Sequence, residues 1–379
     1  MIDTSVSKMG GLESPSGPPD RGGKFMGEPN GKETVIAKPE TLMTFCTDVF
    51  EKLGVPHEEA VIAADAIVGS NLRGVDTHGV IRMLVYSAKL RAGCVNPKPN
   101  LRPLRETKGT ALIDGENGFG QIVGYRAMEI ALKKAKEVGV SCVSVRNSNH
   151  FGTCARYSMM ASSQDMIGLA FTNASAQIAP TGGAEKMLAN NPWSIAVPAG
   201  ERFPVVLDMA NSVVARGKIR QAAKEGRSIP PDWAVDKSGQ PTTDPKAALE
   251  GFLLPIAGYK GYGITLMVDL LTGVLANSAY GPRVQGLDIV EAIGGVGHTF
   301  MAIDVAAFDD VAEFKARIDA YIDEIKGSKK AAGVEVIYMP GEIEFLKMEE
   351  RRRKGIPLHI NIVNDLRKIA RENGVPLDL

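Results

Sequence analysis

The chain has 379 residues, of which 44% are hydrophobic and 23% charged, as in soluble proteins that bury a substantial core in about two domains. Lys and Arg number 44, as do Asp and Glu, so the net charge is zero and no basic excess points to nucleic acid or an anionic membrane. The four cysteines form neither a Cys-x-x-Cys pair nor a zinc-type cluster, and there is no signal-peptide or membrane-spanning pattern, so we expect reduced thiols in a cytoplasmic protein without a metal centre.

Residues 1–37 are rich in Gly, Pro, Ser and charged residues and show no apolar period. Such a composition predicts a disordered leader. The alternative is a transit peptide, but acidic residues such as Asp3, Glu13 and Asp20 argue against one.

Two amphipathic helices are predicted next, over Pro39–Leu53 and Glu58–Leu72. A glycine that can turn left-handed, Gly74, follows the second helix. Asp76 or Thr77 then resembles the N-cap of a third helix, which we expect to end at Gly93.

This reading places His78 in the first turn of the third helix, where the positive end of the helix disfavours an imidazolium. Arg82 lies four residues later, on the same helical face. A neutral base beside a guanidinium suits a small hydroxy-carboxylate, because Arg holds the carboxylate while the base meets the neighbouring hydroxyl. The alternative is a capped helix start with a surface arginine, since this spacing often occurs by chance.

A proline-broken connector, Cys94–Pro103, leads into a region of short β-like runs. Seven strands are predicted, at Thr110–Ile113, Ser141–Val145, Ile167–Thr172, Ser194–Val197, Pro204–Leu207, Thr299–Val305 and Val334–Tyr338. Helices are predicted at Gln121–Val138, Thr153–Ser163, Ser212–Glu225, Tyr262–Asn277, Asp309–Lys326, Glu344–Gly355 and Ile360–Asn373. Several strands follow one another without an intervening helix, which favours a mixed sheet over an all-parallel one.

The same pattern predicts an α/β domain and a helical domain built from separated pieces. The helical pieces are 38–105 and 212–290, the α/β pieces are 106–211 and 291–343, and 344–379 forms C-terminal helices.

The usual dinucleotide fingerprint is missing. Gly118-Phe-Gly120-Gln-Ile-Val-Gly124 lies between a predicted strand and a predicted helix, but its third glycine is one position late. Glycine placement is the physical basis of that motif, so we discount it. No Walker-type phosphate loop occurs either.

Three other places resemble ligand loops. Asn147–Gly152, which contains His150, lies between a strand and a helix and could bind an anion at the helix N-terminus; a turn histidine is the equal alternative. Asp208 ends an apolar strand, where a helix cap is the usual explanation. Lys260 lies in the glycine-rich stretch Gly258–Gly263, which suits either a phosphate contact or a surface turn.

Together these blocks resemble the malate/L-lactate dehydrogenase family, which is unrelated to the Rossmann-type enzymes. The similar blocks are Arg73–Gly79, Asn149–Gly152, Pro180–Glu185, Asn190–Pro192, Leu207–Ala210, Tyr259–Gly263 and Tyr338–Glu342, in the family's order. The resemblance implies an α/β fold: a mixed, seven-stranded, non-Rossmann nicotinamide-binding domain, a discontinuous helical domain, and a homodimer.

The resemblance also implies roles for individual residues. His78 is the expected proton donor and acceptor, His150 is a catalytic or cofactor-facing histidine, and Asp208 orients or supports a histidine. The implied cofactor contacts are Asp208, Met209, Ala210, Lys260, Gly261, Gly341, Glu342 and Ile343. The implied substrate contacts are Thr77, Arg82 and Asn191. Thr77 stands where the family usually has serine, so the hydroxyl is kept while the extra methyl narrows the pocket.

We therefore expect an NAD- or NADP-dependent oxidoreductase that interconverts a small 2-hydroxy acid and its 2-oxo acid. The first alternative keeps the fold and cofactor but reduces cyclic imino acids. The second alternative is a non-catalytic, dimeric metabolite-binding protein with a dehydrogenase fold.

Overall fold

The computed structural model describes residues 34–379, and most of the predicted leader lies outside this range. The last residues of that predicted leader form a strand, β1 (Thr34–Ala37). It pairs antiparallel with β11 (Ile356–His359), near the other end of the chain. The predicted boundary at residue 37 is therefore late by the length of this strand.

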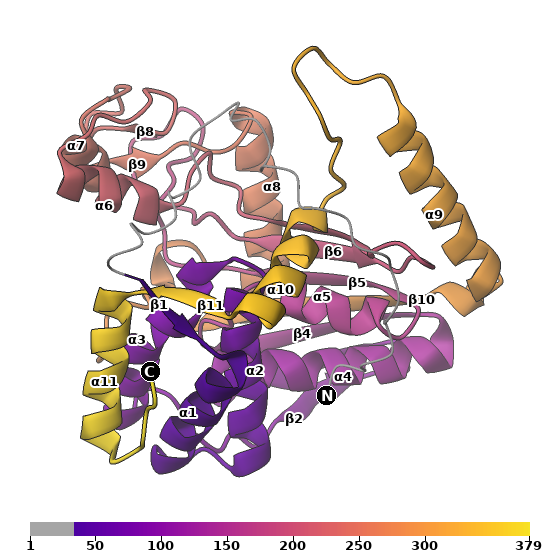
Figure 1. The fold of residues 1–379 in the computed structure, drawn as a ribbon, viewed down its shortest axis with the longest axis horizontal. Helices are drawn as coiled ribbons and strands as arrows, with labels where there is room; N and C mark the ends of the chain where they lie inside the picture. Colours follow the sequence, from indigo (N-terminus) through magenta and orange to yellow (C-terminus); the bar gives the residue numbers. More distant parts are fainter. Residues whose placement is uncertain (1–33) are drawn as a thin grey trace.

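A seven-stranded sheet forms the centre of the molecule, in the order β2-β3-β4-β10-β5-β6-β7 (Figure 1). Its strands are β2 (Arg102–Glu106), β3 (Thr110–Asp114), β4 (Val140–Ser148), β5 (Met166–Thr172), β6 (Trp193–Val197), β7 (Val205–Met209) and β10 (Val296–Asp304). Only the β3–β4 pair of this sheet is parallel, so the predicted mixed seven-stranded α/β architecture is confirmed.

The predicted number of strands is right, but one member of the set is wrong. β2 was not predicted, and its first two residues were assigned to the connector Cys94–Pro103; the run Val334–Tyr338 forms no strand. All residues of β2 are exposed at the edge of the sheet, so no apolar alternation marks it. Val334–Tyr338 has β-branched and aromatic residues but no neighbouring strand, and β-propensity depends on such context.

Helices cover both faces of the sheet. α4 (Gly120–Val138) and α5 (Ala155–Ser162) pack on one face, where Phe300 of β10 joins their hydrophobic cluster. The next residue back, Thr299, donates a hydrogen bond to Leu271 O in the π-helical segment η3 (Leu270–Val274). Successive residues of a strand point to opposite faces, so η3 covers the other face. η3 continues α8 (Tyr259–Asp269).

A helical layer packs beside the sheet, and the two ends of the chain build it together. Its core contains residues of α1 (Pro39–Lys52), α2 (His57–Leu72), α3 (Met83–Arg91) and α11 (Ile360–Asn373), together with β1 and β11. α10 (Glu342–Lys354) leads from the sheet domain into β11 (Figure 1).

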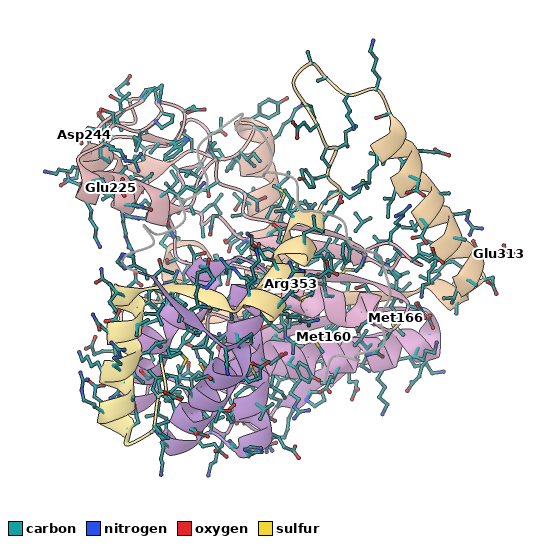
Figure 2. The ribbon with its side chains drawn as sticks, in the orientation of Figure 1. Met160, Met166, Glu225, Asp244, Glu313 and Arg353 are labelled. Atoms are coloured by element: carbon teal, nitrogen blue, oxygen red, sulfur yellow. The ribbon has the colours of Figure 1, made fainter. Side chains whose placement is uncertain are left out.

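A smaller unit carries α6 (Arg216–Glu225), α7 (Pro245–Glu250), β8 (Ala234–Val235) and β9 (Phe252–Leu253). It has its own hydrophobic cluster, which includes Ile178 and Ile219. Figure 2 shows Glu225 and Asp244 of this unit at the opposite side of the molecule from Glu313 of α9 (Val311–Gly327).

Candidate functional site

His78 lies on a broken turn rather than in an α-helix. The predicted third helix is split into two 3₁₀ turns, η1 (Asp76–His78) and η2 (Val80–Arg82), before α3 begins. The prediction that Asp76 or Thr77 caps this helix is wrong, because neither side chain caps a helix there.

The side chain of Asn71 causes the break. Its amide donates to Asp76 Oδ1 at 2.6 Å, and its Oδ1 accepts the Val80 N–H at 2.8 Å. A Cβ on Gly79 would lie 2.1 Å from Asn71 Oδ1, so only glycine lets the loop wrap this closely around the amide. Arg351 of α10 forms an ion pair with Asp76, with 2.7 Å between Nη1 and Oδ1. The loop is therefore fixed by contacts outside itself.

Arg82 remains close to His78 despite the break. Its Nε donates to Thr77 O at 2.7 Å, which anchors the guanidinium group beside the histidine. The Thr77 hydroxyl lies 3.0 Å from His78 Nδ1, so the hydrogen bond expected of the family's serine is present with threonine.

His150 lies in the loop between β4 and α5, where the sequence placed it. α4 packs tightly against this loop, because a Cβ on Gly120 would lie 2.2 Å from Asn149 O and 2.4 Å from His150 O. The next residue, Phe151, stacks on His298 of β10 with ring centroids 4.4 Å apart. The buried His298 is held in turn by Thr172 at 2.8 Å and Ser148 at 2.9 Å.

The structure brings His78 and His150 together. Their rings stack with centroids 5.5 Å apart and planes inclined by 19°. Behind them, the Tyr86 hydroxyl of α3 lies 2.7 Å from His150 Nδ1. Sequence reasoning used Tyr86 only as part of an apolar stripe; its place one helical turn after Arg82 was the available signal.

Both histidines are held in the neutral form. Burial, followed by the positive charge of Arg82, lowers the pKa of His78 to about 4. Burial, His78, Arg82 and His298 together lower the pKa of His150 well below its ordinary value. The neutral state was expected, but its cause is not the predicted helix terminus, because His78 does not lie in one.

Asp208 lies at the end of β7 and binds the start of α5. Its Oδ2 accepts the Ala155 N–H at 3.1 Å, and it makes no hydrogen bond to a histidine of the described chain. The anion predicted at the N-terminus of this helix is thus supplied by the protein itself. The residue is solvent-exposed, yet desolvation by the surrounding protein raises the pKa of its carboxyl group to about 6, while the Ala155 N–H and Arg73 act in the opposite direction.

Arg73 is a second residue that sequence reasoning did not assign to the site. It is 8% exposed, and its guanidinium carbon lies 4.7 Å from the centroid of the Phe345 ring. Within residues 34–379 its Nη1 is buried without a hydrogen-bond partner. A buried N–H without a partner is costly unless a ligand supplies an acceptor.

The stretch Gly341–Ile343 lies beside β7. The Val206 N–H donates to Pro340 O at 2.9 Å, and a Cβ on Gly341 would lie 2.8 Å from the Val206 Cβ. The predicted cofactor contacts Asp208–Ala210 and Gly341–Ile343, far apart in sequence, therefore adjoin each other.

Lys260 and Gly261 were expected in a turn, but both lie in the first turn of α8. Lys260 is exposed, and no hydrogen bond or ion pair within the described residues ties it to the histidines. Asn191 is fully buried, with its amide engaged by Ala174 N at 3.2 Å and Thr265 O at 2.9 Å. Neither arrangement brings these side chains to the histidine pair.

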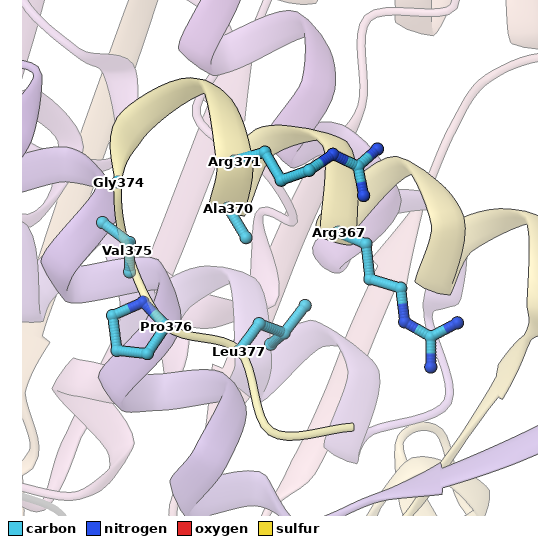
Figure 3. Close-up of a pocket in the computed structure, with 7 residues that line it drawn as sticks. All are labelled: Arg367, Ala370, Arg371, Gly374, Val375, Pro376 and Leu377. Carbon is cyan, nitrogen blue, oxygen red and sulfur yellow. The ribbon is translucent and has the colours of Figure 1, made fainter.

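The residues present fit a nicotinamide cofactor. The orphaned Nη1 of Arg73 supplies a donor near Asp208, and the half-buried residues at the end of β7 and the start of α10 adjoin it. A separate hollow of about 530 Å³ lies between α11 and the chain end, lined by Arg367, Ala370, Arg371, Gly374, Val375, Pro376 and Leu377 (Figure 3). It contains none of the predicted site residues.

In the described part of the chain, no helix has the length and apolar character needed to cross a bilayer.

Comparison with known proteins identifies relatives along most of the chain. The sequence profile of the family described as "Malate/L-lactate dehydrogenase" matches residues 37–367. The L-sulfolactate dehydrogenase of Methanocaldococcus jannaschii is 43% identical over 344 residues, which cover 91% of this chain and 99% of that protein. The malate dehydrogenase of Pyrococcus horikoshii is 42% identical over 352 residues, which cover 90% and 97%.

Solved structures agree with the sequence comparison. Sulfolactate dehydrogenase from M. jannaschii aligns with a TM-score of 0.86 over 90% of this chain and 98% of that one. Delta1-piperideine-2-carboxylate reductase from Pseudomonas syringae is 25% identical and aligns with a TM-score of 0.80 over 89% and 100%.

Proposed function

This chain belongs to the malate/L-lactate dehydrogenase family, and from that premise we propose that it is an NAD(P)-dependent oxidoreductase that interconverts a small 2-hydroxy acid and its 2-oxo acid. The stacked pair of neutral histidines beside Arg82 carries the proposal. A 2-hydroxy acid needs a cation for its carboxylate and an uncharged base for the neighbouring hydroxyl, and this pair of groups supplies both.

His150 is the better placed of the two histidines to move the proton. Its Nδ1 is held by Tyr86 at 2.7 Å, and no hydrogen bond within residues 34–379 occupies its Nε2. Among the same residues, the only side-chain hydrogen bond of the His78 ring is to the exposed hydroxyl of Thr77. The sequence analysis placed His78 first; the geometry supports His150 at the hydroxyl and His78 at its flank.

Each residue then has a defined task. Arg82 holds the substrate carboxylate, and His150 Nε2 exchanges a proton with the oxygen on C2. When bound, the nicotinamide cofactor supplies or accepts the hydride at C2. Asp208, Met209, Ala210, Gly341, Glu342, Ile343, Lys260 and Gly261 are the proposed cofactor contacts.

The two relatives described above are named for sulfolactate and malate, acids that carry a second anionic group. We propose the same substrate class here. The test measures oxidation of NADH and NADPH with pyruvate, oxaloacetate and sulfopyruvate. Turnover of at least one of these 2-oxo acids supports the proposal, and no turnover with any of them overturns it.

Reduction of cyclic imino acids is the second candidate, favoured by the alignment with the piperideine carboxylate reductase. Adding a cyclic ketimine carboxylate to the same panel distinguishes the two, because its product carries no hydroxyl. If calorimetry detects neither NADH nor NADPH binding, the chain is instead a non-catalytic member of the family.

A homodimer and a cytoplasmic location are also proposed. Support for the dimer is a face of α8 and η3 that exposes Ile264, Met267, Leu270, Val274 and Leu275 by 40 to 59% of their surface. Monomeric proteins seldom expose contiguous apolar surface of this kind. Support for the location is that all four cysteines are free thiols.

A further inference from the structure

The contacts of His150 define which of its ring nitrogens carries the proton. The Gly152 N–H donates to His150 Nδ1 at 3.4 Å, and the Tyr86 hydroxyl lies 2.7 Å from the same atom. A backbone N–H can only donate, so Nδ1 is the acceptor and carries no hydrogen. The tyrosine hydroxyl must then donate to Nδ1 as well, and the single proton of the neutral ring lies on Nε2.

Gln121 lies in the first turn of α4, two residues after Phe119, whose ring packs against Tyr86. It is 1% exposed, and neither its Nε2 nor its Oε1 has a hydrogen-bond partner of normal geometry in the described chain. Gln121 is nevertheless close enough to the Tyr86 hydroxyl to affect its pKa. Burial raises the pKa of Tyr86 to about 12, while Arg82 and Gln121 act in the opposite direction. A buried amide without partners is costly, so its position beside the hydroxyl calls for a role.

We propose that Tyr86 is the proton partner of His150 during turnover and that Gln121 positions and stabilises it. Both are positioning residues that act through His150. The inference rests on the proposed function and extends it.

The proton steps balance without a charged histidine. In the reducing direction, the C2 carbon gains the hydride and its oxygen becomes negative. The His150 Nε2–H bond then breaks, and its proton goes to that oxygen. The Tyr86 O–H bond breaks at the same time and its proton binds Nδ1. The ring changes tautomer and stays neutral, the negative charge ends on the Tyr86 oxygen, and solvent later restores that proton. Oxidation runs the same steps in reverse.

The surroundings favour this route over an imidazolium. The groups that face His150 are His78 and Arg82 from the broken turn, Tyr86 from α3 and His298 from β10. Burial and the positive charge of Arg82 both oppose a second cation here. Burial also opposes a tyrosinate, but Arg82 and Gln121 offset part of that cost. The ring of Phe119 packs edge-on against the ring of Tyr86, with centroids 5.1 Å apart, and so limits the movement of the tyrosine ring.

The first experiment reads the tautomer directly. Nitrogen-15 NMR of the cofactor-free protein labelled at histidine should show His150 with its hydrogen on Nε2, assigned by its absence in His150→Gln. Tyr86→Phe should keep the hydrogen on Nε2, because the Gly152 N–H still donates to Nδ1, but it should shift the Nδ1 resonance, because the shorter hydrogen bond to Nδ1 is lost. Tyr157→Phe is the matched control, since the Tyr157 hydroxyl is also buried but donates to Phe151 O. An identical spectrum in Tyr86→Phe and wild type overturns the proposal.

The second experiment reads the proton route. The reduction rate of the wild type should be nearly flat between pH 6 and pH 9 if proton release from a neutral pair limits it. In Tyr86→Phe an imidazolium is the only donor left, so the rate should fall about tenfold for each pH unit of alkalinisation. The reduction rate of Gln121→Leu should also fall as the pH rises, whereas that of Tyr157→Phe should stay nearly flat. A flat profile in Tyr86→Phe overturns the proposal.

The two experiments separate this inference from the function on which it rests. If no 2-oxo acid is turned over, the proposed function fails, and the NMR comparison alone decides whether Tyr86 donates its proton to His150 Nδ1.

Discussion

At the scale of single residues, the uncharged state of His78 and His150 follows from burial and one cation. Arg82 stands beside both rings because its Nε is tied to the backbone of Thr77. The same guanidinium is the proposed carboxylate anchor. In the proposed function, this one side chain therefore binds the substrate and adds to the effect of burial that keeps the neighbouring bases neutral.

The first prediction concerns His150. Replacement by Gln should lower kcat by about 100-fold or more, because general acid–base catalysis is lost. Cofactor affinity by calorimetry should change little. The control is His57→Gln, at a histidine whose side chain is 71% exposed on α2. A folded His150→Gln protein with nearly full turnover would contradict the assignment.

Residue chemistry also limited what the sequence could predict. The His78 and Arg82 neighbourhood could be inferred from spacing, and the histidine pair from resemblance. Tyr86 and Gln121 could not be assigned, because an aromatic residue and an amide on helices are usually packing or surface residues. Only the three-dimensional approach of α3 and α4 to the His150 loop distinguishes them.

At the scale of elements, the approach of α4 to the His150 loop is a steric condition that can be tested. Gly120→Ala should force the loop away from α4, destabilise the protein by about 1–3 kcal/mol and lower turnover. Gly217→Ala is the matched control, because its Cβ meets nothing within 4 Å on α6. That change should alter stability by about 1 kcal/mol or less and leave turnover intact. Equal behaviour of the two variants, measured by urea unfolding and assay, would refute the steric argument.

His298 joins β10 to β4 and β5, and its pKa is lowered to about 3 by burial. Its ordinary value is 6.5, so below that pH the unfolded chain binds a proton that the folded chain does not, and stability falls as the pH falls. At pH 5 this loss is about 2 kcal/mol.

The corresponding prediction compares wild type with His298→Asn by urea unfolding. The variant should be less stable at pH 7, because two hydrogen bonds and a ring stack are lost. The difference should shrink by about 2 kcal/mol at pH 5, since the other titrating groups are common to both proteins. A difference that is independent of pH would show that His298 is protonated in the folded state.

The elements that sequence reasoning missed share a physical cause. β2 lies at an edge with every side chain exposed, so no apolar pattern marks it. The break at Gly79 depends on the Asn71 side chain, which reaches it from the previous helix. Strands with a buried face, such as β5, were predicted because they form short, mainly apolar runs.

At the scale of the whole molecule, we propose a division into three units that follows the hydrophobic clusters. The helical unit combines the chain's N-terminal helices with β11 and α11, the sheet unit holds α4 and α5, and the segment around α6 and α7 is a small unit of its own. The sequence analysis had joined that last segment to the helical domain.

The proposed homodimer gives a further prediction. Met267→Glu places a charge in the centre of the apolar face of α8 and η3, where the native side chain is 56% exposed. Sedimentation should change from dimer to monomer, because an unpaired charge in an apolar interface is costly. The control is Val61→Glu, an exposed apolar position on α2. A wild type that sediments as a monomer would disprove the dimer itself.

The pairing of β1 with β11 has a consequence for synthesis on the ribosome. The strand Thr34–Ala37 emerges early, but its partner Ile356–His359 is among the last segments to be made. The nascent helices α1 to α3 must therefore wait, with their apolar faces open, until α11 arrives to close them. Much of the central sheet can assemble during that wait, so the segment of the chain that is translated first is among the last to mature.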